Sequence, residues 1–552
     1  MNHEGILYRH VYRHVVVLSA LVALVLSACG GSSPKKPSAS DAGKVSSGKS
    51  DAGSTTNAKT DSGMMLVNKP TKKPDAGAPK PTACTSDAEC DDKLLCSGKE
   101  VCDSGTCKHT EVPCKGQLCD ESMKAACSAP TNVDGITLDP STKMQTMIGW
   151  EATAQTGQDD VPAASYDAYI DELLDDVVND LGITRLRVEL RSGAESTAGG
   201  GTYPIVNDNA DPNVIDPKGF DFSVLDKQID KIVLPMKKRV EANGEKLFFN
   251  LNYVSFLDKV TVTPSLHAEQ PEEYAEFVYA TYKHVKDKYD LDIDAWEPIL
   301  EPDNVQAWTP QRIGAAIAAA ATRLKKEGFT PSFIAPSCTD MGHAITYYDT
   351  MIQTPGVLPY ILELSYHRYG GVSDQNLMAI QMRSQRDHVG SSMLEHIGSD
   401  YVDLHKDLSL AWNTSWQQFT LAFPGANDGG GKYYAIINPT SASPQIQMMD
   451  RTKFLRQYFK FVRPGAVRFG ASASVGKFEP LAFTNPSGKV VVVVKSNAGG
   501  GFAIDGLPDG KYGIKYTTAS EYDIDAPDAG AWGGQLLVAN IPAAGVITIY
   551  GK

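Results

Sequence analysis

Two glutamates stand at the ends of short apolar segments, and their type and spacing point most clearly to chemistry. Glu301 ends the run Ile293-Asp-Ala-Trp-Glu-Pro-Ile-Leu-Glu301, and a proline follows it at a turn. Glu395 comes 94 residues later, at the end of Ser392-Met-Leu-Glu395. Two carboxyl groups that flank one bond can act as a pair: one donates a proton while the other attacks carbon or activates water. The two glutamates therefore predict acid/base chemistry of the kind that cleaves a glycosidic bond.

Glu297 is a rival for the role of the acid. Glu297 and Glu301 are four residues apart, so an extended strand would point both side chains to the same side. Glu301 is preferred because it lies nearer to the end of the strand. The alternative for Glu301 and Glu395 is that each is an ordinary carboxylate at a turn or strand end.

Other polar and aromatic residues fall at the ends of expected strands and are candidates for contacts with a substrate. Arg187 is expected either to brace Glu395 or to form a structural ion pair. Trp150 is a candidate for stacking on a sugar ring, with burial in the core as the alternative. The predicted substrate-binding residues are Arg187, Asn252, His367, Tyr369 and Trp150.

The elements that must position these residues alternate between strand and helix. Amphipathic helical patterns and glycine stops separate short apolar runs, which is typical of repeated β/α units. We therefore expect an α/β protein with a (β/α)8 TIM barrel over residues 133–463, whose active site lies at the C-terminal ends of the strands. A doubly wound open sheet is the alternative, disfavoured because no G-x-G-x-x-G loop follows an early strand. The expected strands are 147–150, 183–188, 246–251, 293–300, 332–335, 361–367, 392–395 and 418–423.

The pattern changes after the barrel. Residues 464–552 contain short alternating runs separated by turn residues, which predicts a C-terminal antiparallel β-sandwich. A short run at 135–138, before the barrel, is a candidate for one more strand of that sandwich.

A cysteine-rich segment precedes the barrel. It holds Cys84, Cys90, Cys96, Cys102, Cys107, Cys114, Cys119 and Cys127. An even count in an exported protein predicts a disulfide-rich module over 84–127 with four disulfides, whose pairing the sequence leaves open among 105 possibilities. Metal binding is the weaker alternative, because the segment has no C-x2-C pair. Cys338 is expected to be a buried free thiol.

The N-terminus has the features of an export signal. Arg9 and Arg13 precede an apolar run that ends in Leu26-Ser-Ala-Cys29, the pattern of a bacterial lipobox. We expect a signal peptide at 1–28, a lipid on Cys29, and a disordered linker over 29–83 that is poor in large apolar residues. An ordinary signal peptide with an incidental cysteine is the alternative. The expected location is the bacterial cell envelope, outside the cytoplasm and on the outer membrane or cell surface, with the lipid as the membrane contact.

Bulk composition excludes one class of partner. The chain of 552 residues has a formal net charge of -14, and 42% of its residues are hydrophobic. Without a cluster of Lys and Arg to neutralise phosphates, nucleic acid is not an expected partner. The sequence does not predict an oligomeric state.

From about Thr142 onward the chain resembles the retaining glycoside hydrolases of clan A, most closely family 30. The resemblance rests on Leu300-Glu301-Pro302, Leu394-Glu395-His396 and Ser365-Tyr-His367-Arg-Tyr369, and on the junction 461–469 followed by 482–494. It implies that Glu301 is the acid/base, that Glu395 is the nucleophile, and that a β-linked polysaccharide or oligosaccharide is cleaved with retention. It implies no metal and no organic cofactor. Glu301 is expected to have a raised pKa and Glu395 to stay ionised.

One residue departs from the family pattern. Position 300 is Leu, where clan A has an Asn that binds the 2-hydroxyl of the sugar. Asn304, Asn250 or Asn252 are candidates to replace that contact. Two rival functions stay open: a non-catalytic carbohydrate-binding or adhesion lipoprotein on a degenerate barrel, and an inverting enzyme on the same kind of barrel.

Overall fold

The computed structural model describes residues 83–131, 133–196, 200–256, 265–427 and 429–552. The predicted signal peptide, the lipidation at Cys29 and all of the linker except residue 83 lie outside these ranges. Within them, no helix combines the length and the apolar character needed to cross a membrane.

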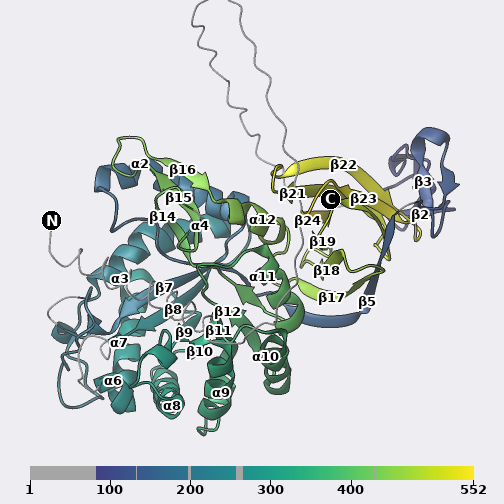
Figure 1. Cartoon of the computed structure of the whole chain (residues 1–552). Helices are drawn as coiled ribbons and strands as arrows, with labels where there is room; N and C mark the ends of the chain where they lie inside the picture. Colours follow the sequence, from purple (N-terminus) through teal and green to yellow (C-terminus); the bar gives the residue numbers. More distant parts are fainter. Residues whose placement is uncertain (1–82, 132, 197–199, 257–264, 428) are drawn as a thin grey trace, which may run out of the picture. The chain divides into compact units, whose positions relative to one another are not determined.

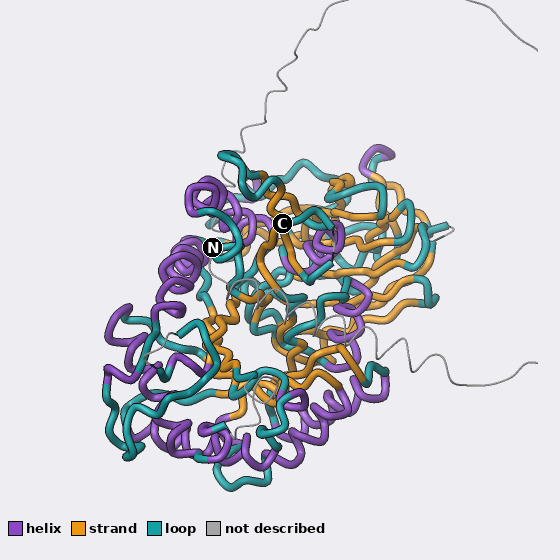
Figure 2. Tube along the Cα trace, turned by 60° about the vertical axis from the view of Figure 1, so that its left-hand side comes forward, coloured by secondary structure: helices purple, strands orange, loops and turns teal. Residues whose placement is uncertain are grey.

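Eight parallel strands close into a barrel, which confirms the predicted fold (Figures 1 and 2). Each strand pairs in parallel with the next along the chain, and the last, β13, pairs back with the first, β6. The strands are β6 (Gly149–Thr153), β7 (Arg185–Arg191), β8 (Phe248–Val254), β9 (Ala295–Glu297), β10 (Phe333–Asp340), β11 (Ile361–Gly370), β12 (Gly390–Met393) and β13 (Ser415–Trp416).

The barrel closes earlier in the chain than predicted. The closing strand is the two-residue β13, whereas the predicted strand at 418–423 corresponds to β14 (Thr420–Pro424). β14 touches β6 only at Thr153 and then pairs with β15 (Lys432–Ile437). β16 (Gln445–Met448) adds an antiparallel strand to this extension.

Helices cover the outside of the barrel strands (Figures 1 and 2). Helix α8 shows why they form: Pro310 occupies its first turn, Thr309 Oγ1 accepts a hydrogen bond from the Arg312 amide, and an apolar stripe including Ile313 and Ile317 is buried. The helices are α2 (Ala163–Asp175), α3 (Ser223–Gln228), α4 (Leu234–Ala242), α6 (Leu266–Glu269), α7 (Pro271–Tyr289), α8 (Pro310–Lys326), α9 (Met341–Met351), α10 (Asp374–Asp387), α11 (Tyr401–Lys406) and α12 (Asp450–Phe459).

The inside of the barrel is polar below the predicted site. Arg185 on β7 donates to both oxygens of Glu363 on β11, at 3.1 and 2.9 Å, and both side chains are fully buried. Because side chains alternate along a strand, Arg187 and His367 point to the same inward side as Arg185 and Glu363. A buried ion pair therefore forms the floor beneath the residues at the strand ends.

A nine-stranded sheet forms the predicted sandwich. The candidate strand at 135–138 is confirmed within β5 (Asp134–Thr146), which pairs antiparallel with β17 (Val467–Ala473). β5 also pairs in parallel with β20 (Gly500–Asp505), so the sheet is mixed rather than wholly antiparallel. The other strands are β18 (Phe478–Thr484), β19 (Val490–Ser496), β21 (Gly510–Thr518), β22 (Ile524–Ala531), β23 (Leu537–Ile541) and β24 (Gly545–Gly551).

The cysteine-rich module holds the four predicted disulfides and two small hairpins. The hairpins are β1 (Lys99–Asp103) with β2 (Thr106–Thr110), and β3 (Leu118–Asp120) with β4 (Ala126–Ser128). The disulfides are Cys84–Cys102, Cys90–Cys107, Cys96–Cys119 and Cys114–Cys127. Cys338 is a buried free thiol, as predicted.

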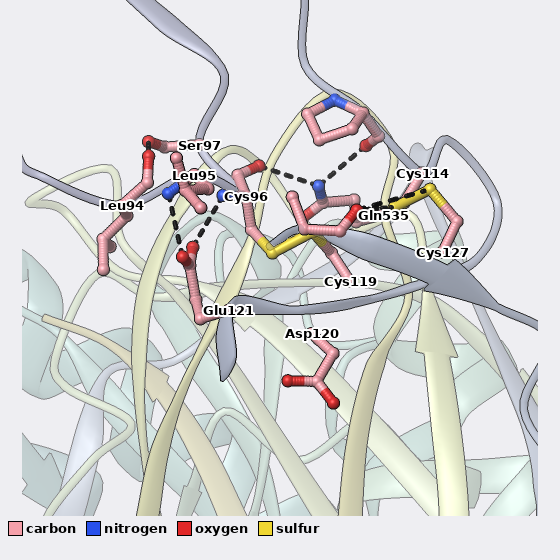
Figure 3. The surroundings of a disulfide bond; sticks show 12 residues. Leu94, Leu95, Cys96, Ser97, Cys114, Cys119, Asp120, Glu121, Cys127 and Gln535 are labelled. Atoms are coloured by element: carbon pink, nitrogen blue, oxygen red, sulfur yellow. Dashed lines mark hydrogen bonds between the residues drawn. A yellow bond between two sulfur atoms is a disulfide. The ribbon is translucent and has the colours of Figure 1, made fainter. Parts of the chain in front are cut away.

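Hydrogen bonds connect the cysteine-rich module to Gln535, in the segment before β23. The buried side-chain amide of Gln535 donates to the carbonyl oxygens of Cys96 and Pro113, at 2.9 and 2.8 Å (Figure 3). Within the module, the Glu121 carboxylate accepts from the backbone amides of Leu95 and Cys96. The module is therefore linked to the sandwich by specific polar contacts.

Candidate active site

Arg187 occupies the centre of the site. It lies two residues beyond Arg185 on β7, towards the C-terminal end of the strand from the buried pair of Arg185 and Glu363. Its guanidinium donates to Glu395 at 2.9 Å and to both oxygens of Glu297, at 2.8 and 2.6 Å. Burial alone would lower the pKa of Arg187, but the charges of Glu297 and Glu395 raise it, so the side chain stays cationic. The sequence analysis expected Arg187 either to brace Glu395 or to form a structural ion pair. In the structure Arg187 does both, because it binds Glu395 and also forms an ion pair with Glu297.

Glu301 follows β9 in a left-handed backbone conformation. Its φ is 50°, and Pro302 begins a short 3-10 helix, Pro302–Asn304, directly after it. A non-glycine residue in this region carries strain of about 1 kcal/mol or more, and such outliers gather at functional sites. The expected turn after the apolar strand is present.

His367 on β11 lies close to both glutamates. Its Nδ1 lies 3.1 Å from Glu301 Oε1. Ligand atoms of Glu301, His367 and Glu395 all lie within 4.8 Å of one another, so one oxygen of each glutamate is within that distance of the other. The two carboxylates that the sequence predicts at the C-terminal ends of the barrel strands are therefore neighbours in the structure.

Glu395 is surrounded by hydrogen-bond donors. Tyr369 OH donates to Glu395 Oε1 at 3.0 Å, and Arg187 holds the other oxygen. Burial raises the pKa of Glu395 and the charge of Glu301 adds to this, whereas His367 and Arg187 lower it. The net direction is upward. Burial and the neighbouring Glu395 also raise the pKa of Tyr369, so the phenol remains a donor.

Both carboxylates keep a small solvent-exposed fraction. The Glu301 side chain is 11% exposed and the Glu395 side chain 8%, whereas Arg187 and His367 are fully covered. The two carboxylates therefore retain a little contact with solvent, whereas Arg187 and His367 have none.

Glu297 does not have the surroundings of a proton donor. It is fully buried, and both of its oxygens are bound to the guanidinium of Arg187. Its part in the site is to orient Arg187, a role that the sequence did not identify.

Asn252 on β8 lies next to Glu297 in the register of the sheet. Its side chain is buried, and neither its amide nitrogen nor its oxygen has a hydrogen-bond partner among the described residues. Asn304, by contrast, donates to Glu301 Oε2 at 3.1 Å. Asn250 is engaged with Glu151 in the barrel interior. Asn252 is thus the candidate amide that still has both polar atoms to offer.

The prediction for Trp150 is wrong. Its ring is fully buried, stacks on Phe459 of α12 with 4.4 Å between centroids, and donates from Nε1 to the Val462 carbonyl. The side chain points outward to the helical layer because its position on β6 has the opposite parity to the inward-facing Glu151. Trp150 is a core residue and has no access to a substrate.

Glu189 is a site residue that the sequence analysis missed. It lies two residues beyond Arg187 on β7 and pairs with Asn252 in the register. Burial raises its pKa. Its period-two spacing from Arg185 and Arg187 was a signal that could have identified it.

Two groups of side chains among the described residues are close enough together to hold a metal ion, but each is already engaged. Glu301, His367 and Glu395 are close enough to hold one, but Glu395 is already bound by the positive charge of Arg187, which would repel a cation. Cys84, Cys90 and Cys107 are also close together, yet all three sulfurs are in disulfides.

No family model matches the sequence. Solved structures, however, share its fold. A family 30 endoxylanase from Clostridium papyrosolvens has 17% identity and a TM-score of 0.55, over 76% of this chain and 100% of the other. The catalytic domain of a family 30 xylanase C from Talaromyces cellulolyticus has 16% identity and a TM-score of 0.57, over 76% and 100%.

An endo-β1,6-glucanase has 15% identity and a TM-score of 0.54, over 78% of this chain and 96% of the other. At such identities the likeness concerns the fold alone. The chain therefore has the glycoside hydrolase fold of family 30, a barrel joined to a sandwich, as the sequence resemblance implied.

Proposed function

We propose that this protein is a retaining glycoside hydrolase that cleaves β-linked polysaccharides or oligosaccharides. The observation that carries the proposal is the approach of one oxygen of Glu301 to within 4.8 Å of one oxygen of Glu395. Carboxyl groups about 5–5.5 Å apart are typical of retaining enzymes, whereas inverting enzymes leave about 6.5–9.5 Å for a water molecule. The short separation favours direct attack by a carboxylate over activation of water between the pair.

Glu395 acts as the nucleophile in this proposal and Glu301 as the acid/base. Glu395 attacks the anomeric carbon while Glu301 gives its proton to the departing glycosidic oxygen, which leaves a glycosyl ester on Glu395. Glu301 then takes a proton from water, and that water attacks the same carbon and frees Glu395. Two inversions at one carbon give net retention.

The surrounding donors support this division of roles. Arg187 and Tyr369 hold the two oxygens of Glu395, which orients the carboxylate and favours its anionic form. Glu301 has His367 beside it rather than a guanidinium. We assign the nucleophile to the carboxylate bound by the arginine, and the proton shuttle to the one bound by the imidazole.

Asn252 is proposed to take the place of the asparagine that is missing at position 300. Leu300 has no polar side-chain atom, and its backbone amide is bonded to the Tyr253 carbonyl. Asn252 is buried beside Glu297 and has both amide atoms without a partner among the described residues. A sugar hydroxyl would satisfy those atoms.

The test uses aryl β-glycosides, with xylosides and glucosides first because the structural neighbours include xylanases and a β1,6-glucanase. On a glycoside with a poor leaving group, Glu395→Gln and Glu301→Gln should each lower turnover by about 10³-fold or more. With a good leaving group, azide should rescue a Glu301→Ala variant, since azide attacks the glycosyl ester without a base. Unchanged turnover in both glutamine variants would overturn the assignment.

A non-catalytic carbohydrate-binding protein is the second candidate, and Leu300 is the residue that favours it. This candidate predicts that β-glucan or xylan binds without release of reducing ends. Release of a product whose first-formed anomer is inverted would instead favour an inverting enzyme.

We further propose that the protein is anchored to the cell envelope by a lipid on Cys29. The support is the sequence alone: a charged start, an apolar run and the Leu-Ser-Ala-Cys29 pattern. Acyl chains on that cysteine would hold the catalytic barrel outside the cytoplasm.

A further inference from the structure

The turn that carries Glu301 is held to the neighbouring strand by Asp303. Asp303 belongs to the 3-10 helix Pro302–Asn304, and its side chain is 3% exposed. Its Oδ1 accepts a hydrogen bond from the backbone amide of Thr339 at 2.8 Å. Its Oδ2 accepts from the hydroxyl of Thr339 at 2.7 Å and from the backbone amide of Asp340 at 3.2 Å. Both oxygens of Asp303 therefore bind the last two residues of β10.

His343, in the first turn of α9, adds a weaker contact to Asp303. Its Nδ1 lies 3.1 Å from Oδ2 of Asp303. The His343 side chain is 60% exposed, whereas that of Asp303 is buried. Because water weakens a contact with an exposed partner, the bonds from Thr339 and Asp340 contribute most to holding Asp303.

The end of β10 also lies against the end of β11. Asp340 pairs with Gly370 in the register of the sheet. A Cβ built on Gly370 would lie 2.5 Å from Oδ2 of Asp340, and one built on Gly371 would lie 2.5 Å from its Oδ1. A larger side chain at either position would therefore displace the Asp340 carboxylate. Since both glycines come directly after Tyr369 in the chain, the end of β10 contacts the turn of Glu301 and also the strand that carries Tyr369.

The carboxylate of Glu301 depends on this turn for its direction. Asn304, at the end of the same turn, donates from its side chain to Glu301 Oε2 at 3.1 Å and from its backbone amide to the Glu301 carbonyl at 2.9 Å. The other carboxylate oxygen, Oε1, lies 3.1 Å from Nδ1 of His367 on β11. A left-handed backbone such as that of Glu301 persists only where surrounding contacts hold it, and Asp303 supplies such contacts.

We propose that Asp303 is a positioning residue for proton transfer by Glu301, an inference that rests on the proposed function. Asp303 acts through the turn and does not itself touch the reacting atoms. A proton donor must lie within about 2.6–3.2 Å of the oxygen that it protonates, and a displacement of about 1 Å can cost about 10²-fold in rate. Without the bonds from Asp303 to β10, the turn is free to move and Glu301 loses its place beside His367. The sequence analysis did not identify Asp303.

The experiment compares two leaving groups on the sugar that the wild type hydrolyses, with the full chain throughout. An alkyl glycoside needs the proton from Glu301, whereas a dinitrophenyl glycoside releases its leaving group without one. Asp303→Ala should lower kcat/KM for the alkyl glycoside by about 10²-fold and leave that for the dinitrophenyl glycoside within about threefold of the wild type. Asp303→Asn keeps one acceptor oxygen for the Thr339 amide, so its loss on the alkyl glycoside should be smaller, about tenfold.

Asp294→Asn is the matched control. Asp294 directly precedes β9, the strand that leads to Glu301, and so lies at its opposite end. Its Oδ2 also accepts from a backbone amide, that of Phe249, at 2.9 Å. The control removes a comparable structural contact, so any loss of kcat/KM should be equal for the two leaving groups. Thermal unfolding of each variant checks that it is folded at the assay temperature.

Two results would overturn the inference about Asp303. One is an equal loss for both leaving groups in Asp303→Ala and Asp303→Asn, and the other is wild-type kcat/KM on the alkyl glycoside in both variants. Glu301→Gln tells this failure apart from a failure of the proposed function. If Glu301→Gln is inactive on the alkyl glycoside while the Asp303 variants are not impaired, only the inference about Asp303 fails. If Glu301→Gln is as active as the wild type, the acid/base assignment itself fails.

Discussion

Arg187 donates from Nη1 to the Glu395 carboxylate over 2.9 Å, from a position fixed on its other edge by Glu297. The guanidinium therefore cannot turn away from Glu395 without breaking a buried bidentate ion pair. This makes Arg187 the part of the site that sets both the orientation and the charge of the proposed nucleophile.

Replacing Arg187 with lysine should lower kcat/KM by about 10²-fold or more, because an ammonium group cannot reach both carboxylates in the same geometry. The loss should be accompanied by a shift of the acidic limb of the pH profile to higher pH, since Arg187 lowers the pKa of Glu395. Arg191→Lys, at the outer end of the same strand, is the control. An unchanged acidic limb in Arg187→Lys would contradict this role.

Burial of Glu395 should raise the pKa of the acidic limb in the pH profile of the wild type. The nucleophile must be ionised, and its pKa is raised. Activity should therefore fall with decreasing pH through an apparent pKa above about 4.3, the usual value for glutamate. A profile of kcat/KM against pH measures this, and an acidic limb at or below the usual value would refute it.

Tyr369→Phe should move that acidic limb further upward. The phenol donates to Glu395 and so favours its charged form; without it, the carboxyl binds a proton more readily. A loss of about tenfold in kcat/KM at neutral pH should accompany the shift. Tyr347→Phe, in the helix α9, serves as the matched change of a tyrosine outside the site.

Glu301→Gly should separate stability from activity. Glycine adopts a φ of 50° without strain. The free energy of unfolding of Glu301→Gly should therefore exceed that of Glu301→Ala by about 1 kcal/mol, which a higher denaturant midpoint would show. Both variants should lose the acid/base function equally. Equal stability of the two would show that the backbone at this turn is unstrained.

Gln535→Ala should weaken the attachment of the cysteine-rich module. The variant leaves two buried carbonyl oxygens without their donor, at a cost of about 1–3 kcal/mol. Limited proteolysis should then cleave the chain near residues 128–133 more rapidly. The surface change Gln385→Ala should leave the cleavage rate as in the wild type.

Much of the fold followed from sequence because its signals are local. Strand-ending carboxylates predicted the meeting of Glu301 and Glu395, and an even count of cysteines predicted the four disulfides. The pairing of the cysteines depends on where the hairpins fold, which no local pattern encodes.

Other features depend on contacts between distant segments and could not be predicted. The closing strand β13 has two residues, too few to show a periodic pattern. Trp150 lies at the predicted strand but on its outer side, because the exact phase of a strand decides which side chains face the axis. The role of Glu297 became visible only when β7 and β9 placed Arg187 against it.

Strand β5 has a consequence for how this protein can be divided. It comes before the barrel in the chain, yet it lies between β17 and β20 of the C-terminal sheet. A fragment cut at residue 464 would leave β5 unpaired on both edges, and a sandwich expressed alone would lack the strand that joins β17 to β20. Exchange of either domain between proteins must therefore carry residues 134–146 with the sandwich, and a ribosome must release nearly the whole chain before that sheet can be completed.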